Sequence, residues 1–272
     1  EDRVAFSQIG LAHVLAVSGY HVGLVGFLPF LFARSKRQGL RWMALFGIPI
    51  LAGYVWLCGQ SESAMRAMFM GSLLLISACL RRRLPLAHAW CLAAWVMALL
   101  EPLTLLKLGT QLSFLAVIGI ALGMEAARSI TRHRLLQIIA VPTGAQSATA
   151  ALTAPTFLQF PLAFLPVNVL AGPVVSVIGM LTMMWVLAPS GSWASTNIHA
   201  LLEPMVHWFL DAVRWMASWE EICLVVKPGD ELRWLLMSLG ALSLFVAMIH
   251  RKRRTWWALA ALCLGGFPWI PY

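Results

Sequence analysis

The sequence predicts an all-α fold, a polytopic transmembrane helical bundle, from two observations. Hydrophobic residues make up 60% of the chain and charged residues 11%, and the mean hydropathy is +0.80. Soluble domains carry a charged fraction of about 25%. Most of the 20 Lys and Arg residues also fall into clusters beside long apolar runs, as they do in the cytoplasmic loops of membrane proteins. These clusters lie at residues 34–41, 81–83, 128–134 and 251–254.

The same clusters account for the net charge of +9, which would otherwise suggest a nucleic-acid-binding surface. We assign the clusters to the cytoplasmic side, and the acidic residues Glu62, Glu101 and 220–231 to the other side. The lipid bilayer is therefore the first partner that the sequence predicts. We expect residues 1–272 to form a single transmembrane domain cut from a longer protein, with 190–231 as a non-cytoplasmic or interfacial segment.

A membrane-spanning helix needs about 20 apolar residues, and nine runs approach that length. They cover residues 8–33, 42–58, 64–80, 84–100, 108–124, 135–154, 166–188, 232–249 and 255–270. The first five alternate correctly between the two sides. The next three cannot, because an even number of crossings must join the basic cluster at 128–134 to the one at 251–254.

Two interpretations would restore the alternation. Residues 142–165 contain several helix breakers, including Pro142 and Pro155, and can form a re-entrant pair or a broken helix inside the protein. We favour this interpretation. Alternatively, residues 200–219 form a further element. Its residues Glu203, His207, Asp211 and Arg214 share one helical face, so the segment is either a crossing with a polar stripe or an amphipathic interfacial helix.

The first apolar run carries polar residues that are costly in a membrane, His13, Ser18 and His21. They can line a polar path, or they can form hydrogen bonds between helices that only stabilise packing. A metal site is disfavoured, because no Asp, Glu or Cys lies at a supporting spacing. Ser18 could also be a hydrolase nucleophile, although its AVSG context lacks the first glycine of a nucleophile elbow. Gly19 and Gly23 offer a small face for close helix packing.

Further polar residues occur in later runs. Arg66 lies about one turn inside its run, where it either reaches out to the lipid headgroups or faces a path and binds phosphate through its planar fork. Gln111 and Gln146 are uncharged hydrogen-bonding groups. Asn168 and Pro173 indicate an interrupted helix. Together these residues predict a bundle with an uncharged polar interior.

Several functional classes are disfavoured by what the sequence lacks. Ion-driven carriers usually hold carboxylates deep in the membrane, and this chain has almost none in its apolar runs. There is no Walker motif and no HExxH motif. The five Cys residues are scattered without a CxxC pair. We therefore predict a conduit without its own motor, without a cofactor and without a metal.

Four segments in order along the chain resemble the ComEC-type competence family of inner-membrane DNA-uptake channels. LAHVLAVSGYHVGLVG (11–26) resembles the family signature LxHxLAVSGxHVG, and SESAMRAMFM (61–70) resembles the helix that contains SAxRA. LGTQLSFLAVIGI (108–120) resembles GxQLSFxAxxGI. The stretch 145–176 resembles the long Gln-, Phe- and Pro-rich segment that ends in NxLAxPxVS.

The resemblance implies a function and a set of partners. Members of this family pass single-stranded DNA across the bacterial cytoplasmic membrane during natural transformation. A cytoplasmic ATPase or the proton gradient would drive the transfer, and periplasmic or cell-surface proteins would deliver the DNA. The HxHxDH motif of the family's nuclease-like domain is absent, so we expect no enzymatic activity. The alternatives are a membrane-embedded hydrolase that uses Ser18 and a histidine, and a structural anchor for missing domains.

Overall fold

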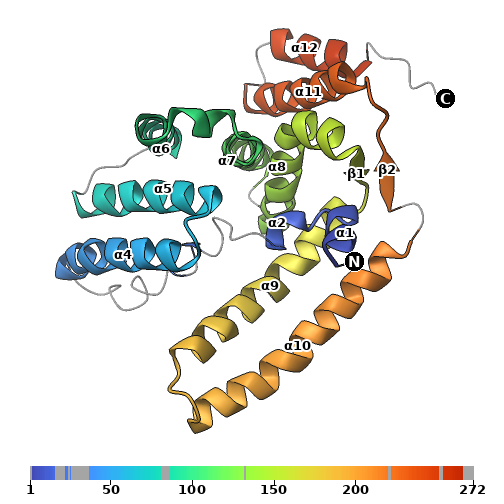
Figure 1. The fold of residues 1–272 in the computed structure, drawn as a ribbon. Coiled ribbons are helices and arrows are strands. Elements are labelled where there is room, and N and C mark those ends of the chain that lie inside the picture. Colours follow the sequence, from blue (N-terminus) through green and yellow to red (C-terminus); the bar gives the residue numbers. More distant parts are fainter. Residues whose placement is uncertain are drawn as a thin grey trace. The chain divides into compact units, whose positions relative to one another are not determined.

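The computed structural model describes residues 2–15, 22–23, 25, 37–80, 86–131, 133–219, 222–250 and 254–265 (Figure 1). Helices dominate this part of the chain, which confirms the predicted all-α bundle. The chain forms two compact units. The first unit comprises residues 1–12, 112–174 and 206–272, and the second comprises 13–111 and 175–205.

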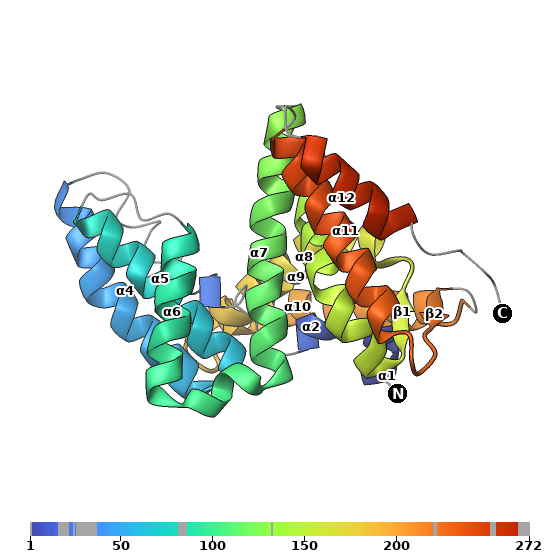
Figure 2. The ribbon, with the colours of Figure 1, turned by 90° about the horizontal axis from the view of Figure 1, so that it is seen from above.

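The second unit contains α4 (Arg37–Leu57), α5 (Glu62–Cys79), α6 (Leu86–Leu100) and the 3₁₀ helix η1 (Pro102–Leu106). These helices match the predicted runs 42–58, 64–80 and 84–100. Helix α5 packs against α4 on one side and α6 on the other (Figure 2). A glycine ends α4: Gly59 has φ +73°, and the next N–H, that of Gln60, donates to the Val55 carbonyl at 2.9 Å. This is the Schellman pattern of hydrogen bonds that closes many helices.

The first unit is built from α7 (Leu108–Ile130), whose first residues up to 111 belong to the second unit, and from α8 (Arg134–Phe157), α11 (Glu231–Ile249) and α12 (Arg254–Gly265). Helix α11 packs against both α8 and α12. Two short strands, β1 (Gln159–Pro161) and β2 (Cys223–Val225), pair antiparallel with Phe160 opposite Leu224. Phe160 also stacks on the buried Trp234 of α11 at a ring separation of 4.8 Å. The strand pair is thereby fixed to the helical core.

Helices α7 and α8 approach closely through glycines. A Cβ added at Gly144 would lie 2.8 Å from the Gly119 carbonyl carbon, and one added at Gly119 would lie 2.7 Å from the Ala148 Cβ. One turn further on, a Cβ at Gly123 would lie 2.7 Å from the Ala140 oxygen. Small residues allow two backbones to come this near, which is how helices commonly associate in membranes.

The predicted break within 142–165 falls near the end of that range. Helix α8 continues past Pro142 and Pro155 to Phe157, and the chain then turns at Leu158, which has φ +53°. The expected re-entrant pair is corrected to one long helix, a short strand and the next helix, α9 (Phe164–Leu187). The backbone of the break is satisfied by pairing, because the Leu158 carbonyl accepts from the Val226 N–H at 2.9 Å.

The start of the first predicted span, 8–33, is also corrected. Helix α1 (Asp2–Gln8) ends at a turn, and α2 (Ala12–Leu15) begins after it. Gly10 has φ +82°, and the Leu11 N–H donates to the Phe6 carbonyl at 2.7 Å. This glycine-based cap stops the helix where the apolar pattern predicted continuity. Of the rest of the span, the structure describes only residues 12–15, 22–23 and 25.

Four of the described helices are long and apolar enough to cross a membrane: α7, α8, α9 and α11. The apolar stretches of α4, α5 and α6 are shorter, at Leu45–Leu57, Ser63–Ser77 and His88–Leu100. Helix α10 (Trp193–Ala217) is different in kind. It buries Phe209 and Val213 on one side, and the other side exposes the polar residues Glu203, His207 and Asp211. This two-faced pattern agrees with the predicted amphipathic helix.

Candidate functional site

Arg66 is the most deeply buried charged residue that the structure describes. It lies one turn into α5, with 3% of its surface exposed. One terminal nitrogen donates to the Thr110 hydroxyl at 2.9 Å, and the other donates to the Gly109 carbonyl at 2.9 Å. Thr110 is fully buried. A guanidinium offers a rigid fork of donors, so one side chain can hold two acceptors at fixed positions.

The burial of the Arg66 guanidinium bears on whether this side chain reaches the lipid headgroups. A snorkelling arginine extends its charged end to the surface, whereas this guanidinium is covered by the beginning of α7. Burial of a charge is costly unless hydrogen bonds compensate for it. The contacts with Gly109 and Thr110 supply two such bonds and join α5 to α7.

The first turn of α7 carries the next predicted residue. Gln111 follows Thr110, and both backbone N–H groups donate to the Lys107 carbonyl, at 3.2 and 3.0 Å. The Gln111 side chain is half-buried and donates to the Leu105 carbonyl at 3.4 Å. Lys107 itself pairs with Glu101 at 3.1 Å. The structure therefore brings the Arg66 side chain, which extends from α5, to the N-terminal end of α7, where Gln111 lies.

A second polar group surrounds the break between α8 and α9. The Gln159 amide donates to the Ser7 hydroxyl, and the Cys223 thiol lies 3.9 Å from the Gln159 oxygen. The Asn168 amide donates to the Phe164 carbonyl at 2.6 Å and to the Gly10 carbonyl at 3.4 Å. These contacts fix the turn after α1 against the break. Asn168 was predicted to mark an interrupted helix, and it lies one turn inside α9.

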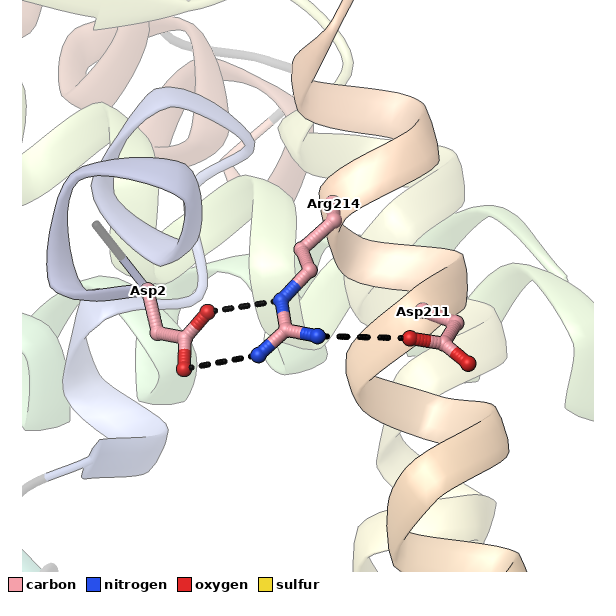
Figure 3. Close-up of polar contacts among 3 residues, drawn as sticks. All are labelled: Asp2, Asp211 and Arg214. Carbon is pink, nitrogen blue, oxygen red and sulfur yellow. Dashed lines mark hydrogen bonds and ion pairs between the residues drawn. The ribbon is translucent and has the colours of Figure 1, made fainter.

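A third group links α1 to α10 at the surface (Figure 3). The Arg214 guanidinium donates to both carboxylate oxygens of Asp2, at 2.8 and 3.1 Å, and to Asp211 at 3.3 Å. Asp2 and Arg214 border a hollow of about 250 Å³. The hydrogen bond from Arg214 holds the pKa of the Asp2 carboxyl below its usual value of 3.8. Beneath the ion pair, the Phe6 ring meets the Phe209 ring edge-on.

The remaining predicted residues are placed as follows. His13 is exposed on α2, and Gln146 is half-buried on α8. Pro173 lies within α9 and is exposed, so the helix continues through it. A Cβ at Gly23 would meet no described atom within 4 Å. Ser18, Gly19 and His21 lie outside the described residues. No cluster of metal ligands occurs among the described residues.

Three structurally important residues escaped the sequence analysis. Thr110 was not singled out within the segment 108–120, yet it accepts the hydrogen bond of Arg66. Gln159 and Gly144 were not singled out either, although Gln159 contacts Ser7 and Gly144 packs against Gly119. The usable signal in the sequence was the GxxxG spacing of Gly119 and Gly123.

Comparison with known proteins identifies the family of this chain. A family model described as Competence protein matches residues 1–254. The ComE operon protein 3 of Bacillus subtilis (strain 168) is 31% identical to this chain over 178 residues. That alignment covers 64% of this chain and 22% of the relative, so the chain spans less than a quarter of the relative's length. No solved structure matches.

Proposed function

This chain belongs to the competence protein family, and from that premise we propose that it conducts single-stranded DNA across the bacterial cytoplasmic membrane during natural transformation. The match over residues 1–254 is the observation that carries the proposal. The four long apolar helices support it, because a conduit must be formed by elements that cross the bilayer.

The polar interior fits the chemistry of a DNA strand. Single-stranded DNA presents charged phosphates along one edge and flat bases along the other, and proteins hold it with polar and aromatic groups. A strand must also leave its contacts again, which favours many weak contacts over a few strong ones. The uncharged amides of Gln111 and Gln146 are groups of this kind, and both are half-buried. We place them on the path, together with His13, Ser18 and His21.

Arg66 belongs to the same proposal as a buried neighbour of the path. The two acceptors of its terminal nitrogens are both neutral oxygens, those of Thr110 and Gly109.

The partners follow from what a passive conduit needs. The strand is pulled by a cytoplasmic ATPase or driven by the proton gradient, and proteins outside the membrane deliver it. The domain resides in the bacterial inner membrane as a multi-pass protein. Cleavage of the other strand is left to another protein or another domain, because this chain carries no nuclease motif.

An uptake assay in a deletion strain tests the proposal. The deletion strain is compared with the same strain in which the native full-length protein is restored. Labelled DNA is scored separately inside the cytoplasm and as fragments outside. We expect deletion to abolish cytoplasmic label, whether or not fragments still form outside. Normal cytoplasmic label in the deletion strain would refute the proposal. Loss of external fragments, with transfer of supplied single strands intact, would support the anchor or hydrolase alternative instead.

A further inference from the structure

Arg66 is bound to the start of α7 rather than open to a ligand. We propose that Arg66 is a positioning residue, which acts on the DNA path through Thr110 and Gly109 by fixing the first turn of α7 and the Gln111 side chain. This inference rests on the proposed function, and it assigns Thr110 a role in that function.

The burial of the pair is the first argument. Arg66 is 3% exposed and Thr110 is fully buried, so a phosphate could reach the guanidinium only after α5 and α7 had moved apart. Both terminal nitrogens already donate at 2.9 Å. A direct contact with DNA would break two good hydrogen bonds for each phosphate that passes, and a conduit that acts repeatedly needs contacts that form and break easily.

The second argument concerns what the contacts hold. Gly109 and Thr110 are the second and third residues of α7, and they offer a backbone carbonyl and a side-chain hydroxyl as acceptors. Arg66 fixes this turn from α5, across 43 and 44 residues of sequence. Gln111 is the next residue, and its amide contacts the Leu105 carbonyl only at 3.4 Å. Its position therefore depends on the turn more than on its own hydrogen bond.

The chain offers a matched control. Thr104 lies on η1, close to α7 in sequence, and it is 2% exposed, almost as buried as Thr110. Its hydroxyl is not an acceptor of either terminal nitrogen of Arg66. A change of Thr104 to Val therefore tests the loss of a buried hydroxyl in this region without touching the proposed link.

The experiment is a double-mutant cycle in the native full-length protein, expressed in its deletion strain. The variants are Arg66→Lys, Thr110→Val, the double variant, Thr110→Ser and Thr104→Val. The readout is cytoplasmic uptake of labelled DNA divided by the amount of folded protein in the membrane. We expect Arg66→Lys and Thr110→Val each to reduce uptake by about tenfold, the size of a typical coupling within one hydrogen-bond network.

Uptake by the double variant should be about as low as uptake by the more impaired single variant, and no lower, because both changes break the same link. Thr110→Ser should retain uptake, since its hydroxyl can still accept, and Thr104→Val should stay near wild type. Multiplicative losses in the double variant would overturn the inference and favour an independent phosphate contact by Arg66. Wild-type uptake in Thr110→Val would overturn it as well.

A second readout separates direct contact from positioning. The salt dependence of oligothymidylate binding is measured on the purified full-length protein in detergent. Removal of a phosphate contact lowers the slope of log affinity against log salt concentration by about 1. Lysine would keep the charge, so the variant for this readout is Arg66→Gln, for which we expect an unchanged slope. A reduced slope would overturn the inference. The proposed function itself fails if the restored wild-type protein gives no more uptake than the deletion strain. That result differs from failure of the inference alone, in which the wild-type protein restores uptake and the variants do not behave as expected.

Discussion

At the scale of single residues, backbone carbonyls are frequent partners of the buried and half-buried polar side chains. Arg66 donates to the Gly109 carbonyl, Asn168 to those of Phe164 and Gly10, and Thr149 to that of Ala145. Such acceptors are available wherever a helix begins, ends or turns. A protein in a low-dielectric medium can therefore satisfy polar groups without burying further charges.

Sequence reasoning could identify Arg66 but not its acceptors. An arginine in an apolar run is visible from its cost alone. Thr110 lies 44 residues away on another helix, and no local pattern connects the two. The same applies to Gln159 and Ser7, which are 152 residues apart. Long-range pairing is set by packing, which a single sequence encodes only indirectly.

The Asp2–Arg214 contact predicts a pH dependence. Because Arg214 lowers the pKa of Asp2 in the folded protein, the contact stabilises the docking of α1 at neutral pH and is lost as the pH falls through that lowered pKa. In Arg214→Gln, we expect the Asp2 pKa to return towards 3.8. Carbon-detected NMR titration of a labelled Asp2 carboxyl in the full chain measures it directly.

Asp211→Asn provides the control for this titration. Asp211 contacts Arg214 through one hydrogen bond at 3.3 Å and leaves the bidentate pair with Asp2 intact. The Asp2 pKa should stay low in that variant. Equal pKa values in wild type and Arg214→Gln would show that the ion pair does not persist in solution.

At the scale of secondary-structure elements, helix ends and helix contacts depend on different signals. The apolar runs predicted most helices of the second unit well, because a run of hydrophobic residues and a helix have similar lengths there. The break after α8 lies near the end of the predicted range 142–165. Proline is tolerated inside α8 at positions 142 and 155, and the turn at Leu158 is instead fixed by pairing between β1 and β2.

The glycine contact between α7 and α8 predicts opposite effects for two similar substitutions. Gly144→Ala would place a Cβ 2.8 Å from the Gly119 carbonyl carbon, so the helices must separate. We expect a loss of about 1–3 kcal/mol in stability, the usual cost of overpacking. Gly172→Ala on α9 meets no atom within 4 Å and should be neutral or stabilising by up to about 1 kcal/mol.

Thermal unfolding of the two variants in the same detergent measures the difference. The two changes add the same methyl group in the interior of a helix, so helix propensity alone predicts the same sign for both. If Gly144→Ala were as stable as Gly172→Ala, the close approach of α7 and α8 would be refuted.

At the scale of the whole molecule, charge distribution predicts the topology. The basic clusters at 81–83 and 251–254 should face the cytoplasm, and the acidic segment at 220–231 should face the other side. Single cysteines placed beside Arg81, Lys252 and Glu220 in a cysteine-free background test this. A label that reacts only in the cytoplasm should reach the first two positions, and reaction at the third would overturn the assignment.

The most direct test of the central proposal is photo-crosslinking of DNA in transit. A photoreactive benzoylphenylalanine is introduced at Gln146, which we place on the path, or at Val141, an exposed apolar residue five positions earlier and on another side of α8. Living cells that take up labelled DNA through the full-length protein are then irradiated. The account predicts a labelled protein–DNA adduct from position 146 and none from position 141. Equal adducts from both positions, or none from 146 while uptake continues, would contradict it.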